Sequence, residues 1–231
     1  VMGSRSTYMR AKIGGVEGRA LKNGDVIKVG ESSPLWKRLC GFQIPEELHL
    51  AQDPEAPLAL ITGLQEDAFT EEGKMLLFES EYTITAESDR MGCRLEGPKV
   101  GHTDKGADIV SDAIPLGAVQ IPGHGMPIIM LADRQTTGGY TKIGVLSPLS
   151  IEALVQKMPG CKVCFRKADV HYGTEEQRRI KDAVGRVKEL RASYVSRFDI
   201  KSPVPASPPL STSFKLTLEG KSYDITCEEI L

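Results

Sequence analysis

Polar residues suited to binding a carbonyl or carboxylate group are concentrated in the stretch Asp133-Arg-Gln-Thr-Thr-Gly-Gly-Tyr-Thr-Lys142. The stretch follows the apolar run 128–131, so a buried strand is expected to present these donors and acceptors at its end. Lys142 and Arg134 are cations that can stabilise negative charge developing on a carbonyl oxygen. The pair Gly138-Gly139 permits close backbone approach. A site for a small polar amide and a turn that only fixes strand order explain the stretch equally well.

A second polar segment is Ser88-Asp-Arg-Met-Gly-Cys-Arg-Leu95. Asp89 and Arg90 can hold a rigid loop through a bidentate pair, or Arg90 can bind a carboxylate substrate. Without further context the structural interpretation is the favoured one. The segment is therefore expected to support a site rather than to form one.

The four side chains His102, Asp104, Asp108 and Asp112 resemble a site for a hard metal ion. Their spacing matches neither the metalloprotease helix motif nor an EF-hand loop, so no metal is predicted and a polar loop is expected. The motif Cys161-Lys-Val-Cys164 lies in an alternating strand pattern that points its two thiols to opposite faces. Such thiols cannot share one metal ion.

Several common enzyme motifs are absent from the sequence, namely a Walker A loop, GxGxxG, HExxH and GxSxG. If the protein takes part in ATP chemistry, we expect another chain to hold the nucleotide.

Short apolar or alternating runs, broken by 23 Gly and 14 Pro, are the dominant pattern that positions these residues. Many short strands favour a mainly β chain with barrels or sandwiches and a few helices. The expected strands are Tyr8 to Ile13, Asp25 to Val29, Leu58 to Thr62, Glu81 to Ile84, Ala118 to Ile121, Pro127 to Ala132 and Lys162 to Arg166.

Three helices are expected. The first follows Thr70, which can cap its first turn. The second follows Ser147 as a cap, with Pro148 at the first helical position. The third runs from Thr174 to about Phe198 and carries one apolar stripe at three- and four-residue spacing.

The C-terminal region changes composition after this helix. Residues 201–213 are rich in Pro and Ser and are expected to form an extended linker. Residues 214–231 alternate around Glu219-Gly220-Lys221 and predict a β-hairpin.

The overall composition excludes several classes of protein. Lys and Arg number 29 against 31 Asp and Glu, so the net charge of −2 indicates neither nucleic acid nor an anionic membrane as a partner. The sequence has no run long enough to span a membrane and no leader peptide, which predicts a cytoplasmic protein. Five cysteines at irregular spacing are not a secreted disulfide framework.

Long motifs in a fixed order resemble the allophanate hydrolase subunit 2 family, also called biotin-dependent carboxyltransferase-like. They are Ser111-Asp-Ala-Ile-Pro-Leu-Gly-Ala-Val-Gln-Ile-Pro-Gly-His-Gly125 running into residues 127–140, together with the 88–95 segment, Gly3-Ser-Arg-Ser-Thr7 and Gly14-Gly-Val-Glu-Gly-Arg19. The resemblance spans most of residues 1–170.

The resemblance implies cyclophilin-like β-barrel domains. Residues 1–52 would be the closing part of a first barrel whose opening segment is missing, and residues 53–172 a second barrel, followed by the helix over 173–200. It also implies two partners. One is a smaller cyclophilin-like subunit, similar to the B subunit of 5-oxoprolinase or to allophanate hydrolase subunit 1, and the other is the A subunit of 5-oxoprolinase.

The activity implied by the resemblance is that of the C subunit of an ATP-dependent 5-oxoprolinase, which opens 5-oxo-L-proline to L-glutamate. The enzyme would be a hydrolase of a cyclic amide C–N bond, with ATP bound mainly elsewhere. Two alternatives stay open. One is the carboxyltransferase part of a urea carboxylase or allophanate-type system, with biotin not attached to this chain. The other is a non-enzymatic antagonist of a histidine-kinase inhibitor.

Site residues follow from the same hypothesis. Lys142, Arg134 and Asp133 are the expected catalytic residues, and Lys142 and Arg134 would polarise the lactam carbonyl or a phosphorylated intermediate. The expected substrate-binding residues are Gln135, Thr136, Thr137, Tyr140, Gln120, Asp89 and Arg90.

Overall fold

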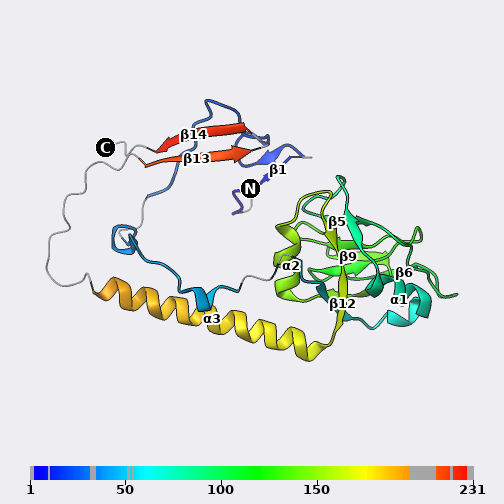
Figure 1. Cartoon of the computed structure of the whole chain (residues 1–231). Coiled ribbons are helices and arrows are strands. Elements are labelled where there is room, and N and C mark those ends of the chain that lie inside the picture. The colour runs from blue at the N-terminus through cyan, green and yellow to red at the C-terminus, as the bar shows by residue number, and fades with distance from the viewer. Residues whose placement is uncertain are drawn as a thin grey trace. The chain divides into compact units, whose positions relative to one another are not determined.

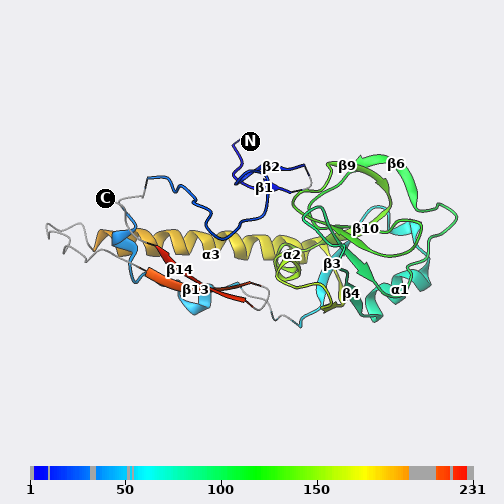
Figure 2. The same cartoon turned by 90° about the horizontal axis from the view of Figure 1, so that it is seen from above.

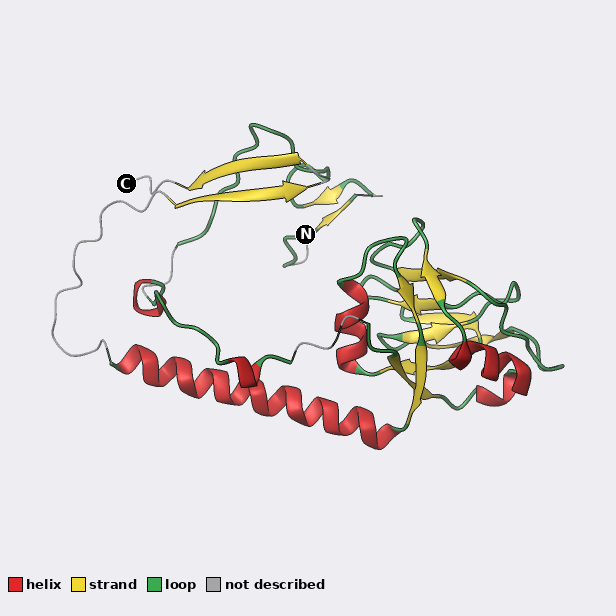
Figure 3. Ribbon diagram, in the orientation of Figure 1, coloured by secondary structure: helices red, strands yellow, loops and turns green. Residues whose placement is uncertain are grey.

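The computed structural model describes residues 3–9, 11–31, 35–50, 53 and 55–197, and the backbone strands 212–218 and 221–227. The chain divides into two compact units, Gln43–Ala192 and Val1–Phe42 with Ser193–Leu231. Figure 1 labels the elements of both units, and Figure 3 colours them by type. The candidate site residues all belong to the unit Gln43–Ala192.

An eight-stranded, barrel-like sheet forms the centre of this unit (Figure 2). The strand order is β11-β4-β5-β8-β7-β10-β3-β12. Neighbouring strands are antiparallel, except that β3 and β12 are parallel. The strands are β3 (Leu58–Thr62), β4 (Tyr82–Ile84), β5 (Gly92–Glu96), β7 (Ala118–Gln120), β8 (Ile128–Met130), β10 (Lys142–Leu146), β11 (Lys162–Val163) and β12 (Phe165–Ala168). The prediction of a mainly β chain with a barrel is confirmed.

The two edges of the sheet come from one short stretch of chain. The predicted strand from Lys162 to Arg166 is divided at Cys164, because β11 pairs with β4 whereas β12 pairs with β3. The carbonyl of Cys164 accepts a hydrogen bond from Leu58 N at 2.8 Å. One residue therefore separates the two edge strands, and the sheet nearly closes on itself.

A two-stranded ribbon packs on the barrel next to β7 and β8. It pairs β6 (Asp108–Ala113) with β9 (Thr137–Tyr140), and Figure 2 shows it near β10. The ribbon is anchored by a small apolar cluster of Ile114, Ala118 and Met130. The polar loop expected around His102, Asp104, Asp108 and Asp112 is wrong for Asp108 and Asp112, because both lie on β6, which pairs with β9.

Two of the three helices begin where the sequence predicts, whereas the third begins at Val170, four residues before the predicted Thr174. α1 (Glu71–Glu79) is capped by Thr70, whose hydroxyl accepts a hydrogen bond from Gly73 N at 3.0 Å. α2 (Pro148–Val155) starts with Pro148, but the hydroxyl of Ser147 makes no capping hydrogen bond. Buried Glu176 instead accepts a hydrogen bond from Leu149 N at 3.1 Å.

Glu176 belongs to α3 (Val170–Ser196), which extends from the barrel unit into the other unit after Ala192. Short 3-10 helices lie at η1 (Lys37–Leu39), η2 (Glu46–Leu48) and η3 (Glu66–Ala68).

The barrel core contains Tyr82, whose ring is fully buried and meets Phe165 edge-on at a centroid distance of 5.9 Å. The Tyr82 hydroxyl donates a hydrogen bond to the carbonyl of Pro98 at 3.0 Å. Burial disfavours the charged phenolate and raises the pKa of Tyr82 to about 12.

We therefore expect one tyrosine to ionise near pH 12 in a spectrophotometric titration, and Tyr82→Phe to abolish that step. Because the folded pKa lies above the unfolded value of about 10, this group stabilises the fold fully below pH 10. That contribution is lost as the pH rises through 12. Ionisation of all tyrosines near pH 10 would contradict the assignment.

Two predicted strands of the other unit are wrong. Residues 8–13 form no single strand, because β1 (Thr7–Tyr8) and β2 (Ile13–Gly14) fold back on each other. Residues 25–29 form no strand either. The Asp25 carboxylate instead binds the guanidinium of Arg19 at 2.7 and 2.8 Å.

The predicted C-terminal hairpin is present in this unit. β13 (Thr212–Leu218) pairs antiparallel with β14 (Lys221–Cys227). The predicted linker over 201–213 lies outside the described residues, apart from the start of β13.

Candidate functional site

Lys142 and Gln120 lie side by side on one face of the barrel sheet. They are directly opposite each other in the pairing of β10 with β7, which places their side chains on the same face. The register then shifts between Lys142 and Gly144. Such bulges change the direction in which a side chain points. Lys142 and Gln120 are therefore cross-strand neighbours at the point where the register changes.

The ammonium of Lys142 binds a carboxylate of the ribbon. Its Nζ donates to Asp112 Oδ2 at 3.0 Å, and the Lys142 side chain is only 11% exposed, against 53% for Asp112. The hydrogen bond from Lys142, followed by one from Ala113 N, holds the pKa of Asp112 below its usual range. Asp112 is therefore charged at neutral pH and covers the lysine from the solvent side.

Gln65 completes this arrangement from the segment that follows β3. Its Oε1 accepts a hydrogen bond from Lys142 N at 2.8 Å. Its Nε2 donates to Asp112 Oδ2 at 3.2 Å. The main chain and the ammonium of Lys142 are thus joined through two further side chains in a closed ring of hydrogen bonds.

The amide nitrogen of Gln120 is buried and has no hydrogen-bond partner among the described residues. Gln120 is 2% exposed. An unsatisfied buried donor costs about 1–3 kcal/mol.

Gly138 of β9 allows the ribbon to approach this amide. A Cβ on Gly138 would lie 2.6 Å from Ile114 Cδ1, 3.3 Å from Gln120 Nε2 and 3.5 Å from Gln135 Nε2. Two amide nitrogens therefore converge on the bare Cα of this glycine. Hydrogen-bond donors in this region come from both sides. Gln135 lies on the ribbon side, and Gln120 and Lys142 lie on the barrel side.

Arg90 and Asp133 meet at a second place. Arg90 Nε donates to Asp133 Oδ2 at 2.8 Å and its Nη2 to Oδ1 at 3.1 Å. Asp133 N also donates a hydrogen bond to the Arg90 carbonyl at 2.8 Å. Together these bonds join the 88–92 loop to the segment after β8. Asp89 Oδ1 accepts hydrogen bonds from Met91 N at 2.8 Å and from Gly92 N at 3.2 Å.

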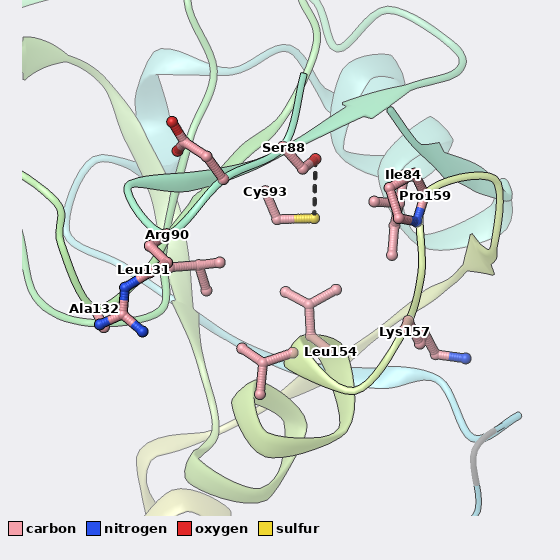
Figure 4. Close-up of a pocket in the computed structure, with 11 residues that line it drawn as sticks. Ile84, Ser88, Arg90, Cys93, Leu131, Ala132, Leu154, Lys157 and Pro159 are labelled. Carbon is pink, nitrogen blue, oxygen red and sulfur yellow. Dashed lines mark hydrogen bonds between the residues drawn. The ribbon is translucent and has the colours of Figure 1, made fainter. Parts of the chain in front are cut away.

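Asp89 and Arg90 line a pocket of about 400 Å³. Figure 4 shows Cys93, Leu131 and Leu154 directed into it, with Lys157 turned outward. Its interior is therefore mostly apolar, and the charged groups lie at its rim.

The other predicted site residues lie outside both of these groups. Arg134 donates to the carbonyls of Ile114 and Leu131 at 2.9 and 3.3 Å, which anchors the end of the ribbon. Thr136 accepts a hydrogen bond from Ile114 N through its carbonyl. Thr137 and Tyr140 lie on β9 with exposed side chains. The structure thus brings Gln120, Gln135 and Lys142 together, and it brings Asp89, Arg90 and Asp133 together elsewhere.

Asp112 and Gln65 were not expected as site residues. Asp112 was assigned to a polar loop, and residues 108–113 do not alternate between polar and apolar types, so no local pattern marks their strand. Gln65 lies 77 positions from its partner Lys142, and no local pattern marks it.

The thiol of Cys93 is 4% exposed, and burial raises its pKa. We expect it to react with Ellman's reagent at pH 8 much more slowly than the exposed Cys40, because the thiolate is the nucleophile. Reaction kinetics of Cys93→Ser and Cys40→Ser identify the phases of these two thiols among the five cysteines. A fast phase that disappears in Cys93→Ser would contradict this expectation.

Comparison with known proteins decides the family. The model for the carboxyltransferase domain, subdomains A and B, matches residues 1–167. The chain belongs to this family. Within it, the chain is similar to the C subunit of 5-oxoprolinase from Haemophilus influenzae, at 32% identity over 178 residues, covering 77% of this chain and 55% of that protein. It is also similar to the C subunit of the Escherichia coli 5-oxoprolinase, at 32% identity over 165 residues, covering 71% and 51%.

The chain thus spans about half the length of the curated relatives it matches. The crystal structure of the K. lactis urea amidolyase has the same fold, with a TM-score of 0.58 at 22% identity, covering 99% of this chain and 14% of that one. No described helix of this carboxyltransferase-family chain has the length and apolar character needed to cross a membrane.

Proposed function

We propose that this chain is part of the C subunit of an ATP-dependent 5-oxoprolinase complex, which opens the lactam of 5-oxo-L-proline to give L-glutamate. The family membership and two relatives with that name support the proposal. The observation that carries it at the level of residues is the buried, unpartnered amide of Gln120 directly opposite Lys142.

The chemistry of this pair suits a lactam carbonyl. Gln120 Nε2 is a neutral donor, and the Lys142 ammonium has two further N–H groups beyond the one directed at Asp112. The ammonium can donate to a carbonyl oxygen and stabilise the negative charge that develops there when the carbonyl carbon is attacked. The Gln120 Nε2 is covered by the ribbon and would join it in binding this oxygen once the ribbon moves. The low exposure of Lys142 and Gln120 strengthens these interactions.

Other expected catalytic residues take supporting roles in this proposal. Arg134 binds main-chain carbonyls, and Asp133 is engaged by Arg90. Both therefore hold the loop and ribbon that carry Gln135. ATP is bound elsewhere in the complex, and the partners are the A subunit of 5-oxoprolinase and the smaller, cyclophilin-like one.

The second candidate function is transfer of a carboxyl group in a urea carboxylase or allophanate-type system. The description of the family as a carboxyltransferase domain favours it. The same donors would bind the carbonyl oxygen of urea, and biotin would arrive on a separate carrier. No specific observation favours the third hypothesis, antagonism of a histidine-kinase inhibitor.

Reconstitution separates these functions. The full-length natural protein is combined with its candidate partner proteins, and the loss of 5-oxoproline, glutamate formation and ATP hydrolysis are measured together. The proposal expects 5-oxoproline-dependent ATP hydrolysis with formation of glutamate. Carboxylation of urea by a biotin carboxylase and a biotinylated carrier, without loss of 5-oxoproline, would replace it by the carboxyltransferase function.

A further inference from the structure

The Lys142–Asp112 pair joins a little-exposed lysine to a carboxylate of the ribbon, and in the barrel unit Lys74, paired with Glu71, is similarly little exposed at 17%. Lys162 with Glu81 and Lys167 with Glu66 are pairs whose lysines are 65% and 61% exposed. Pairs of this kind contribute little, because solvent screens them and both side chains stay mobile. Lys142 is 11% exposed and lies beneath its carboxylate. Its ammonium is therefore held in one place.

Gln65 strengthens this constraint, because it binds both ends of the interaction. Its Oε1 accepts from Lys142 N at 2.8 Å, and its Nε2 donates at 3.2 Å to the same Asp112 Oδ2 that accepts from Lys142 Nζ. The remaining oxygen of Asp112 accepts from Ala113 N at 2.7 Å. Both oxygens of the carboxylate are thus occupied, and its orientation is fixed from the barrel and from the ribbon.

We infer that Asp112 and Gln65 are positioning residues, which hold the Lys142 ammonium beside the Gln120 amide before the substrate binds. The inference rests on the proposed function of Lys142 and Gln120. A lysine loses rotamer freedom when it is immobilised. Because the ring of hydrogen bonds has already imposed this loss, the ammonium needs no reorganisation when charge develops on the substrate.

The first test measures the position of Lys142 without any assay of activity. The full-length protein is treated with sulfosuccinimidyl acetate, and the rate of acetylation of each lysine is followed by mass spectrometry. We expect slow acetylation of Lys142 in the native protein and several-fold faster acetylation in Asp112→Asn and in Gln65→Ala. Lys162 serves as the internal control, since its rate should be the same in all three proteins. Equal rates at Lys142 would overturn the inference.

The second test measures the consequence in the reconstituted complex. Asp112→Asn keeps the shape of the side chain and removes its charge, and we expect it to lower kcat by about 10- to 100-fold, because small displacements of a reacting group have effects of this size. Glu81→Gln is the matched control, since it makes the same change opposite the exposed Lys162. Its kcat should stay within twofold of the native value.

A third variant excludes a purely structural role. If Asp112 acts through Lys142, adding Asp112→Asn to Lys142→Ala should lower the residual turnover by less than threefold. A larger further loss would overturn the positioning role. An inactive Lys142→Ala together with a fully active Asp112→Asn would also overturn the positioning role of Asp112. The proposed function would remain in place. An active Lys142→Ala would remove Lys142 from the reaction and overturn the inference, whereas a native complex without 5-oxoproline turnover would contradict the proposed function itself.

Discussion

Lys142→Ala is expected to lower 5-oxoproline-dependent turnover by roughly 10²- to 10³-fold, the effect of removing one donor to a developing oxyanion. Lys142 is the cation opposite the unpartnered amide of Gln120, and it is 11% exposed. Gln120 alone would then stabilise the charge on the carbonyl oxygen. ATP hydrolysis and glutamate formation by the reconstituted complex measure the loss.

Assembly of the complex should survive this substitution, because the Lys142 side chain bonds only Asp112 among the described residues. Size-exclusion chromatography of the variant complex checks this point. Lys162→Ala is the control, since it removes an exposed lysine whose partner is Glu81. Turnover within twofold of the native rate in Lys142→Ala would remove Lys142 from the reaction.

Gly144→Ala is expected to destabilise the barrel unit by about 1–3 kcal/mol, the typical cost of overpacking. A Cβ at this position would lie 2.3 Å from the carbonyl oxygen of Ile61 and 3.0 Å from Thr62 Cα. These are backbone atoms of β3, the strand that pairs with Gly144. They cannot rotate away, so the two strands must separate or the bulge beside Lys142 must rearrange. Denaturant unfolding, followed by circular dichroism, measures the change.

Gly185→Ala is the matched control for this substitution. Gly185 lies within α3, and a Cβ there would meet nothing within 4 Å. Alanine favours a helix over glycine by up to about 1 kcal/mol, so this variant should be as stable as the native protein or more stable. A Gly144→Ala protein with native stability would show that β3 and β10 are more loosely packed than their separation indicates.

Local patterns in the sequence were sufficient for much of the fold. The run Leu58 to Thr62 predicted β3 correctly, because an apolar run bounded by turn residues is typical of a buried strand. Thr70 and Pro148 marked the starts of α1 and α2, since capping and first-turn preferences depend only on neighbouring residues.

The same patterns failed where pairing with a distant segment decides the structure. Residues 25–29 have a strand-like composition but no strand partner, and Asp25 binds Arg19 instead. The alternating run around Cys164 is typical of one strand, yet the barrel divides it between β4 and β3.

For the candidate site, the sequence by itself determined the residue types and part of their location. Lys142 and Gln120 were both recognisable as polar residues at strand ends. Their direct opposition, the burial of Gln120 and the contacts of Lys142 with Asp112 and Gln65 depend on the register of β7 with β10 and on the ribbon packed beside them. Only the tertiary structure decides these relations, because a shift of one residue in register would turn each side chain to the opposite face of the sheet.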